Sequence, residues 1–182
     1  MGREQHGDGG DGALVARVLA GDTEAFGVLI ERYRQQFGRY ATAMCGDADR
    51  AADAMQEAFI RAYDGLAGCR EPDRFGSWFF RILTNQCHNH RRGTRAHQSL
   101  DGVTVSSPDS PERDLASAEI REAIDRALDD LSPELRETFV LREIEGRTYP
   151  EIAALLETAE PALRKRVERA RQTVRSALEE WL

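Results

Sequence analysis

Apolar residues recur every three to four positions along two segments of this chain, and the stretch between those segments breaks the pattern. The spacing is typical of amphipathic helices, because positions three and four residues apart share one helix face. No convincing run shows the alternating pattern of a β-strand. The interrupting stretch, residues 96–115, contains a Ser/Pro-rich run and few large apolar residues, as linkers do. The sequence therefore predicts an all-α protein of two small helical domains on a flexible linker.

The first predicted domain covers residues 13–95 and contains four helices. The Gly/Asp-rich residues 1–12 are expected to be disordered. Aspartates before the apolar runs predict helix starts at Asp22, at Asp47 or Asp49, and at Asp73, since Asp is a favoured N-cap residue. The fourth helix should reach about Arg92.

The second predicted domain covers residues 116–182. Ser132 followed by Pro133 is typical of a helix start, with Ser as the cap and Pro at the first helical position. Gly146 should end that helix. A short helix over Tyr149–Leu156, a tight turn and a final helix complete the prediction.

Bulk properties exclude several classes of protein. The chain has 182 residues, so each domain has only a modest core. No apolar run approaches the roughly 20 residues that span a bilayer, and the N-terminus does not resemble a signal peptide. Cys45, Cys69 and Cys87 are an odd and widely spaced set, which argues against a disulfide framework. We therefore expect a cytoplasmic protein without membrane insertion.

The charge is unevenly distributed. The net charge is −7, yet no Asp or Glu occurs from Arg74 to Leu100, where there are five arginines. From Ala159 to Arg175, six basic residues accompany only Glu160 and Glu168. Two basic segments in an acidic chain indicate two contacts with DNA and a separate partner for the acidic surfaces.

The last part of the chain has the pattern of a helix-turn-helix, the fold unit that places its second helix in the major groove. The apolar residues expected to pack the two helices at a steep angle are Ile152, Leu155, Leu156, Leu163, Val167 and Ala170.

The opposite face of the final helix is basic. Arg164, Lys165 and Arg169 lie near its N-terminal end, where a recognition helix meets base edges. Arg166 and Arg171 flank this face and are expected to hold phosphates. Arginine suits guanine through a bidentate pair. The alternative is an amphipathic helix with a solvated basic face, and the short helix, turn and basic helix together favour duplex DNA.

The first basic segment combines aromatic and polar residues without acids. Stacking surfaces beside backbone-binding charges suit single-stranded nucleic acid. Phe75, Phe79 and Ile82 also have core spacing, so the aromatic residues have both interpretations. The candidate single-strand contacts are Arg74, Trp78, Arg81, Asn85, Asn89, Arg91 and Arg92.

The third expected helix has an acidic side. Asp49, Asp53, Gln56 and Glu57 recur at steps of three and four, opposite an apolar side with Met55, Phe59 and Tyr63. The acidic side is either a solvated face or a docking face for a basic partner.

Catalytic and metal-binding patterns are missing. The sequence has no Ser/His/Asp or Cys/His arrangement and no phosphate-binding glycine loop, so we expect no enzyme and no cofactor. Cys87, His88 and His90 form no recognised four-ligand set, which argues against zinc.

Four ordered motifs resemble the sigma-70 family, specifically its small extracytoplasmic-function (ECF) group. Leu14–Phe26 resembles the opening of sigma region 2, and Asp53–Tyr63 is similar to its D-x-x-Q-E-x-F helix. Phe75–Asn85 is similar to the F-x-x-W-L-x-R-I-x-x-N helix. Leu131–Glu137, with Val140–Glu143, Gly146 and the helix-turn-helix, resembles region 4.

The resemblance implies protein partners. Asp53, Gln56 and Glu57 would dock on the clamp helices of the β′ subunit of core RNA polymerase. Region 4 would contact the β flap, and the linker would lie in the RNA exit path. An anti-sigma factor is a candidate partner.

The resemblance also implies two promoter contacts. The loop Gly65–Arg74 and the helix Trp78–Arg92 would capture the melted −10 element, with a flipped base in a pocket. The −35 element would be read through Arg164, Lys165, Arg166 and Arg169.

The chain departs from the family pattern in the recognition unit. Glu157 stands where the family usually has Gly, and Pro161, Ala162 and Lys165 replace its usual residues. Asn89 stands where an Asp is common. An altered promoter sequence is one explanation, and a region 4 that contacts DNA mainly by charge is the other.

Two rival functions use only part of the sequence. A helix-turn-helix regulator that acts without polymerase would not need the Asp53–Phe59 and Phe75–Asn85 motifs. A sigma mimic that titrates an anti-sigma factor would not need the basic segments. The expected function is therefore a sigma factor that directs promoter-specific initiation.

Overall fold

The computed structural model of the chain describes residues 9–98 and 123–179, and for residues 92–98 it describes the backbone. The chain divides into two compact units, residues 1–87 and residues 88–182. Both are helical, as predicted. The predicted linker, residues 96–115, lies outside the described residues except for the last turn of a helix that continues to Gln98.

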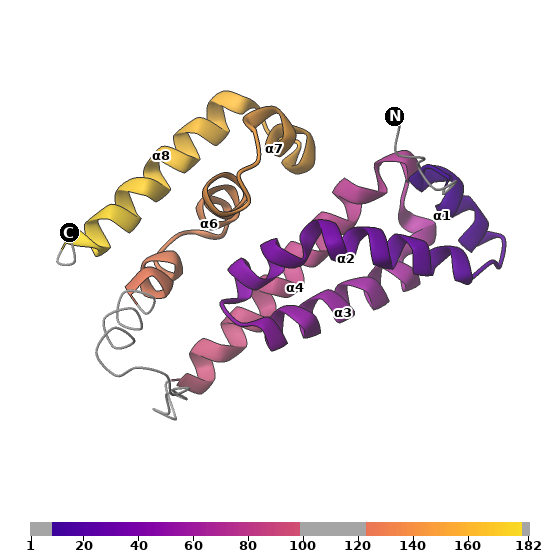
Figure 1. The fold of residues 1–182 in the computed structure, drawn as a ribbon, viewed down its shortest axis with the longest axis horizontal. Helices are drawn as coiled ribbons and strands as arrows, with labels where there is room; N and C mark the ends of the chain where they lie inside the picture. The colour runs from indigo at the N-terminus through magenta and orange to yellow at the C-terminus, as the bar shows by residue number, and fades with distance from the viewer. Residues whose placement is uncertain (1–8, 99–122, 180–182) are drawn as a thin grey trace, which may run out of the picture. The chain divides into compact units, whose positions relative to one another are not determined.

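The first unit is a helical bundle closed by two short 3₁₀ turns (Figure 1). Its elements are α1 (Asp11–Leu19), α2 (Glu24–Cys45), α3 (Ala48–Asp64), η1 (Leu66–Gly68), η2 (Pro72–Arg74) and the first part of α4 (Phe75–Gln98), a helix that continues past residue 87. The four predicted helices are present in order. α1 begins two residues before the predicted start, and α4 runs past Arg92.

Two of the predicted helix starts are formed by aspartate carboxylates. Oδ1 of Asp47 accepts the amide N–H of Arg50 (2.9 Å), directly after Gly46 ends α2 in the left-handed conformation with φ +75°. The carboxylate of Asp22 accepts the N–H of Ala25 (3.4 Å), although the N-cap position itself belongs to Thr23. The third prediction was wrong, since Asp73 lies within η2, which leads directly into α4.

Aromatic side chains form the core of the first unit. Phe59 of α3 stacks on Phe79 of α4 with ring centroids 4.5 Å apart. Phe37 of α2 packs against Phe80 of α4 (5.0 Å), and Tyr40 lies 4.7 Å from the same ring. All five rings are at most 5 % exposed. These contacts hold α2, α3 and α4 together as one bundle.

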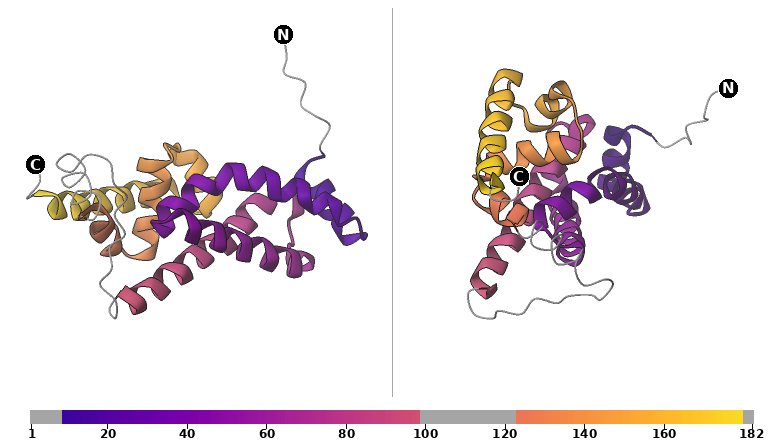
Figure 2. Two further views of the ribbon diagram at one scale, coloured as in Figure 1. Left: turned by 60° about the horizontal axis from the view of Figure 1, so that its bottom comes forward. Right: turned by 60° about the vertical axis from the view of Figure 1, so that its left-hand side comes forward.

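α1 lies at one end of this bundle, against α2 and η2 (Figures 1 and 2). The carboxylate of Asp11 accepts hydrogen bonds from Arg32 and from the hydroxyl of Tyr33. Burial, together with the hydrogen bond to Asp11, raises the pKa of Tyr33 well above its usual value. Asp11 is therefore an anchor for α1 and does not belong to a disordered tail.

The second unit contains the last helices of the chain. Residues 123–129 are helical, and α6 (Pro133–Phe139), the π-helical turn η3 (Val140–Ile144), α7 (Tyr149–Leu156) and α8 (Glu160–Ala177) follow. The predicted start of α6 is confirmed, because Oγ of Ser132 accepts the N–H of Leu135 and Pro133 is the first helical residue. Leu128, Leu131 and Ala170 form a core against which Phe139 and Val174 pack.

Within residues 9–98 and 123–179, no helix is both long enough and apolar enough to cross a membrane.

Gly76 allows α4 to approach α2 closely, and its replacement tests the fold of the first unit. A Cβ at position 76 would lie 2.8 Å from the hydroxyl oxygen of Tyr33, which is buried and held by Asp11. We expect Gly76→Ala to lower the free energy of unfolding by about 1–3 kcal/mol in urea titrations followed by circular dichroism. The matched control is Gly38→Ala in α2, where a Cβ meets nothing within 4 Å. Equal stability of both variants would contradict this packing.

Candidate nucleic-acid interface and docking surfaces

α7 and α8 pack as the predicted helix-turn-helix (Figure 1). The apolar side chains of Ile152, Leu155, Leu163 and Val167 are buried. Thr148 starts α7 with a capping box: its hydroxyl accepts the N–H of Glu151 (3.4 Å), whose carboxylate accepts the N–H of Thr148 (2.7 Å). The buried side of α8 thus faces α7 and α6, and its other side is left for solvent.

The basic residues predicted to contact duplex DNA lie on α8, but they have different environments. Arg164, Lys165 and Arg169 are exposed, whereas Arg166 is half-buried. Arg171 is also exposed and donates to the carboxylate of Glu143 in η3 (2.8 Å). That ion pair raises the pKa of Arg171. The exposed basic side chains therefore follow α8 from Arg164 past its middle, and Arg171 is held beside η3.

Two further residues join this surface that sequence reasoning missed. The Arg142 guanidinium carbon lies 4.8 Å from the centroid of the Tyr149 ring, and that of Arg164 lies 4.3 Å from the same centroid. Arg142 belongs to η3 and Tyr149 begins α7, so neither is in the recognition helix. The sequence pattern of α8 alone cannot reveal Arg142 and Tyr149, because they come from other elements. The turn at Gly146 brings these two residues close to α8.

The turn between α7 and α8 contains a strained residue. Glu157 has φ +51° and ψ +41°, the left-handed conformation, and it is the only non-glycine residue with positive φ in the described chain. A side chain in this conformation costs roughly 1–2 kcal/mol. The glycine that the family usually has here would not incur that cost.

α4 presents a polar stripe along one side. Arg81, Asn85 and Asn89 are exposed, and Trp78 is half-exposed beside Phe75, with ring centroids 5.6 Å apart. These positions follow one another at steps of three and four, so they share a helix face. We call this face, from Trp78 to Asn89, the α4 polar stripe.

The structure resolves the two interpretations of the aromatic residues. The side chains of Phe75, Phe79 and Phe80 are 0 % exposed, so they form core and cannot stack on bases. Among these four aromatic residues, only Trp78 remains available for stacking.

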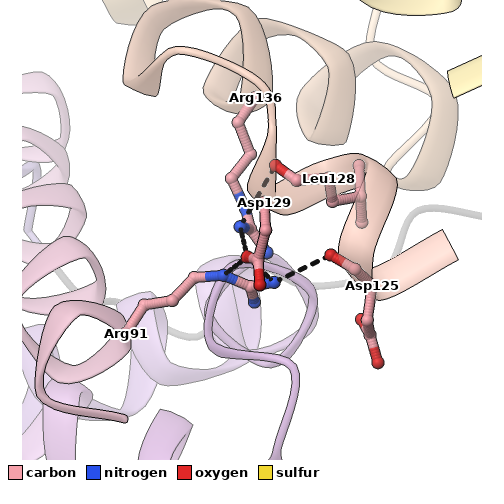
Figure 3. A network of polar contacts seen from close by, with 5 residues as sticks. All are labelled: Arg91, Asp125, Leu128, Asp129 and Arg136. Carbon is pink, nitrogen blue, oxygen red and sulfur yellow. Dashed lines mark hydrogen bonds and ion pairs between the residues drawn. The ribbon is translucent and has the colours of Figure 1, made fainter. Parts of the chain in front are cut away.

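The other candidates around α4 are not on the α4 polar stripe. Arg74 lies in η2 and pairs with Glu71 (3.2 Å). The side chain of Arg92 lies outside the described part. Arg91, in the second unit, points elsewhere: it donates to the carboxylate of Asp129 and to the carbonyl oxygen of Asp125 (Figure 3).

Asp129 also serves a buried arginine of the second unit. Arg136 is 3 % exposed and donates through Nη1 to Asp129 (3.0 Å) and to the carbonyl of Leu128 (3.4 Å) (Figure 3). Its Nε and Nη2 have no hydrogen-bond partner among the described residues. Burial and the adjacent Arg91 lower the pKa of Arg136 to about 10, against the opposing effect of Asp129. One carboxylate thus neutralises two arginines.

The acidic side of α3 is exposed as predicted, with Asp49, Asp53, Gln56 and Glu57 all in contact with solvent. Glu57 has a structural contact as well. With its amide nitrogen facing α3, the buried Gln86 donates to Oε2 of Glu57 (3.0 Å) and accepts from Nε of Arg61 (2.7 Å). Glu57 therefore helps to join α3 to α4.

An apolar groove continues from this acidic side. It lies between α2 and α3, has a volume of about 390 Å³ and is lined by Phe26, Ile30, Arg34, Gln56, Phe59, Ile60, Tyr63 and Asp64. Ile60 is 53 % exposed and Tyr63 is 42 % exposed, so Tyr63 lies at the edge of the apolar side predicted for this helix, whereas Met55 and Phe59 are buried. The Tyr63 ring instead packs edge-on against Phe26 at 5.1 Å.

Cys87, which the sequence analysis considered as a zinc ligand, is a core residue. Its side chain is 0 % exposed in the core of the first unit, away from solvent ligands. Within the described residues, no three His, Cys, Asp or Glu side chains form a group that could hold a metal ion.

Comparisons with known proteins match both units. The family model of sigma-70 region 2 matches residues 29–97, and that of sigma-70 region 4 matches residues 121–174. The RNA polymerase sigma-H factor of Pseudomonas aeruginosa is 33 % identical over 94 % of this chain and 95 % of its own length. The ECF RNA polymerase sigma-E factor of Escherichia coli K12 is 32 % identical over 90 % of this chain and 92 % of its own. The chain therefore belongs to the sigma-70 family.

Solved structures are similar as well. CnrH, in complex with the cytosolic domain of CnrY, is 28 % identical with a TM-score of 0.64, over 93 % of this chain and 97 % of that one. The sigma factor RpoE of Bartonella quintana, in complex with the anti-sigma factor NepR, is 26 % identical with a TM-score of 0.50, over 84 % and 93 %. The resemblance to the ECF group drawn from the motifs is thereby confirmed.

The backbone of Glu157 generates a stability prediction. Glu157→Gly should raise the free energy of unfolding by about 1 kcal/mol, because glycine adopts positive φ without steric cost. Glu157→Ala is the control, since it removes the same carboxylate but keeps the Cβ that causes the strain. Urea unfolding of the three proteins measures the difference. An equal gain for both variants would assign the effect to charge and not to backbone conformation.

Proposed function

We propose that this sigma factor binds core RNA polymerase through α3, holds the single-stranded −10 element along the α4 polar stripe, and reads the duplex −35 element with α8. The observation that carries the proposal is the exposed basic side of α8, with Arg164, Lys165 and Arg169, on a helix-turn-helix whose apolar side chains are buried. Sigma factors are initiation factors and not enzymes, so these surfaces bind and position DNA for the catalytic polymerase.

The reading of the −35 element is supported by the position of the basic residues on α8. Arg164 and Lys165 are exposed in the first two turns of α8 and Arg169 at its middle, and α8 is the helix that enters the major groove in helix-turn-helix proteins. Arginine can pair with guanine at two atoms. Arg166 and Arg171 are placed to hold phosphates beside them.

The contact with the −10 element rests on the α4 polar stripe. Trp78 offers a half-exposed ring for stacking, and Arg81, Asn85 and Asn89 offer a cation and two amides along the same face. Arg74, in η2, and Arg92 are further proposed contacts with the same strand. Arg91 must exchange its contact with Asp129 for DNA before it can take part.

Docking on polymerase is supported by the surface of α3. Asp49, Asp53 and Gln56 are exposed beside the apolar groove at Ile60 and Tyr63. An apolar centre with a polar rim is the usual anatomy of a protein interface. We assign this surface to the clamp helices of the β′ subunit, and we assign a contact with the β flap to the second unit.

An anti-sigma factor is a further proposed partner. CnrH and the Bartonella RpoE were each solved with another protein bound, which for RpoE is an anti-sigma factor. We infer that a protein of this kind controls when the present chain reaches polymerase in the cytoplasm.

Transcription in vitro tests the proposed function. Core RNA polymerase with this protein should start transcripts at fixed positions on a library of genomic fragments, and core enzyme alone should not. Arg164→Ala should reduce transcript from the recovered promoters about tenfold or more at limiting protein, since one bidentate base contact contributes roughly 1–3 kcal/mol. Arg175→Ala, an exposed arginine near the other end of α8, is the matched control. Tight duplex binding without any defined start would instead identify a regulator that acts without polymerase.

The docking surface generates a prediction of its own. Ile60→Ala should weaken binding to core polymerase about 5- to 30-fold, because it removes apolar area at the centre of the proposed interface. Leu19→Ala is a matched control, since Leu19 is 56 % exposed and Ile60 53 %, but Leu19 lies in α1 away from the groove. Titration of labelled protein with core enzyme gives both constants. An equal loss of affinity for Ile60→Ala and Leu19→Ala would show that the groove is not part of the interface.

A further inference from the structure

The ring of Tyr149 has two cationic neighbours that come from different elements. Arg142 approaches it from η3 at 4.8 Å, and Arg164 approaches it from α8 at 4.3 Å. Both distances are within the range of about 6 Å in which a cation is attracted to an aromatic face. Tyr149 itself is half-exposed, so this assembly lies at the surface and not in the core of the helix-turn-helix.

Tyr149 has a rigid base. It is the first residue of α7 and lies between Thr148 and Pro150. Thr148 and Glu151 form the capping box that starts the helix, and the ring of Pro150 fixes the φ angle of that residue. Arg142 is held too, because its Nη1 donates to the carbonyl oxygen of Arg147 (2.7 Å) across the turn at Gly146. The ring and the first guanidinium thus belong to a preformed surface.

Arg164 has little else to hold it. Its ion pair with Glu160 (3.4 Å) is exposed on both sides, and pairs of this kind contribute little. A long side chain without a fixed direction loses rotamer freedom when it binds a base. Stacking on a fixed ring restricts the Arg164 side chain already in the free protein. The entropy that this side chain loses on binding DNA is therefore smaller.

We propose that Tyr149 is a positioning residue that orients the Arg164 guanidinium towards the base pair it reads in duplex DNA. The inference rests on the proposed −35 function and adds a determinant of specificity outside the recognition helix. Tyr149 acts through Arg164 and needs no contact with the base pair. The neighbouring cation Arg142 adds positive potential at the same place.

A purely structural role for Tyr149 predicts something different. If the ring only stabilised α7, its loss would lower stability and weaken binding to every DNA sequence equally. A positioning role changes the preference at the base pair read by Arg164 and leaves the other base pairs unaffected. Sequence preference therefore separates the two roles, whereas affinity alone does not.

The test uses the holoenzyme of core polymerase with the full chain. The probe is a duplex library that carries one promoter recovered in the transcription experiment, with eight base pairs of its upstream element randomised. Bound duplexes are sequenced for the wild-type protein, Arg164→Ala, Tyr149→Leu and Tyr149→Phe. Leu removes the aromatic face, and Phe retains it without the hydroxyl.

We expect Arg164→Ala to abolish the preference at one or two base pairs. Tyr149→Leu should reduce the preference at those same base pairs about 2- to 5-fold, the range expected for loss of a cation–π contact at a surface site. Tyr149→Phe should select the wild-type motif. Combined with Arg164→Ala, Tyr149→Leu should have no further effect, because its target is then missing.

Each contrary result has a distinct meaning. An unchanged motif for Tyr149→Leu, or an equal loss at all base pairs, overturns the positioning role and leaves the −35 function intact. A wild-type holoenzyme that initiates but selects no upstream motif overturns the −35 reading, and the inference with it.

A measurement without DNA covers the case in which Tyr149→Leu does not fold. In the NMR spectrum of the wild-type chain, the side-chain protons of Arg164 next to the guanidinium should be shifted upfield by the ring, relative to those of Arg175. Tyr149→Phe should retain that shift, and Tyr149→Met should abolish it. Equal shifts for Arg164 and Arg175 in the wild-type chain would overturn the proposal.

Discussion

The stacking of Phe59 on Phe79, with Phe37 packed beside them, determines what the first unit can present to its surroundings. These rings require one side of α3 and one side of α4 to face inwards. The residues half a turn away must then face solvent, whatever their chemistry. The acidic residues of α3 and the α4 polar stripe therefore both lie outside the same aromatic contact, so one core fixes the position of two exposed surfaces.

The second unit has less apolar core, and it relies on polar contacts for its shape. Its capping box fixes the start of α7, the pair of Arg171 and Glu143 ties α8 to η3, and Arg136 is buried against Asp129. A buried arginine with two unpartnered nitrogens is costly, because desolvation of the charge is only partly compensated. The left-handed Glu157 adds backbone strain in the same unit. The position of α8 in this unit therefore depends more on these polar contacts than on the burial of apolar surface.

Much of this architecture could be predicted, because helix boundaries depend on local chemistry. Asp47, Ser132 and the span Tyr149–Leu156 follow from capping and apolar spacing within a few residues. The spacing placed Met55, Phe59 and Tyr63 on one apolar side, but spacing alone cannot tell the buried positions, Met55 and Phe59, from Tyr63 at the edge of a groove. Other contacts join residues that are far apart along the chain. Arg91 binds Asp129, 38 positions away. The ring of Tyr149 contacts Arg142 and Arg164, which are 7 and 15 positions away. No local pattern contains that information.

The net charge of −7 is compatible with DNA binding because electrostatic interactions are local in salt solution. At physiological ionic strength, charges beyond about 8 Å are largely screened, so a phosphate near α8 responds to Arg164, Lys165 and Arg169 and little to distant acids. The same acids reduce the general attraction to DNA that a uniformly basic protein would have. Binding then depends on two small surfaces that must be brought to the promoter together. A polymerase that holds both is the physical condition under which such weak and separate contacts become selective.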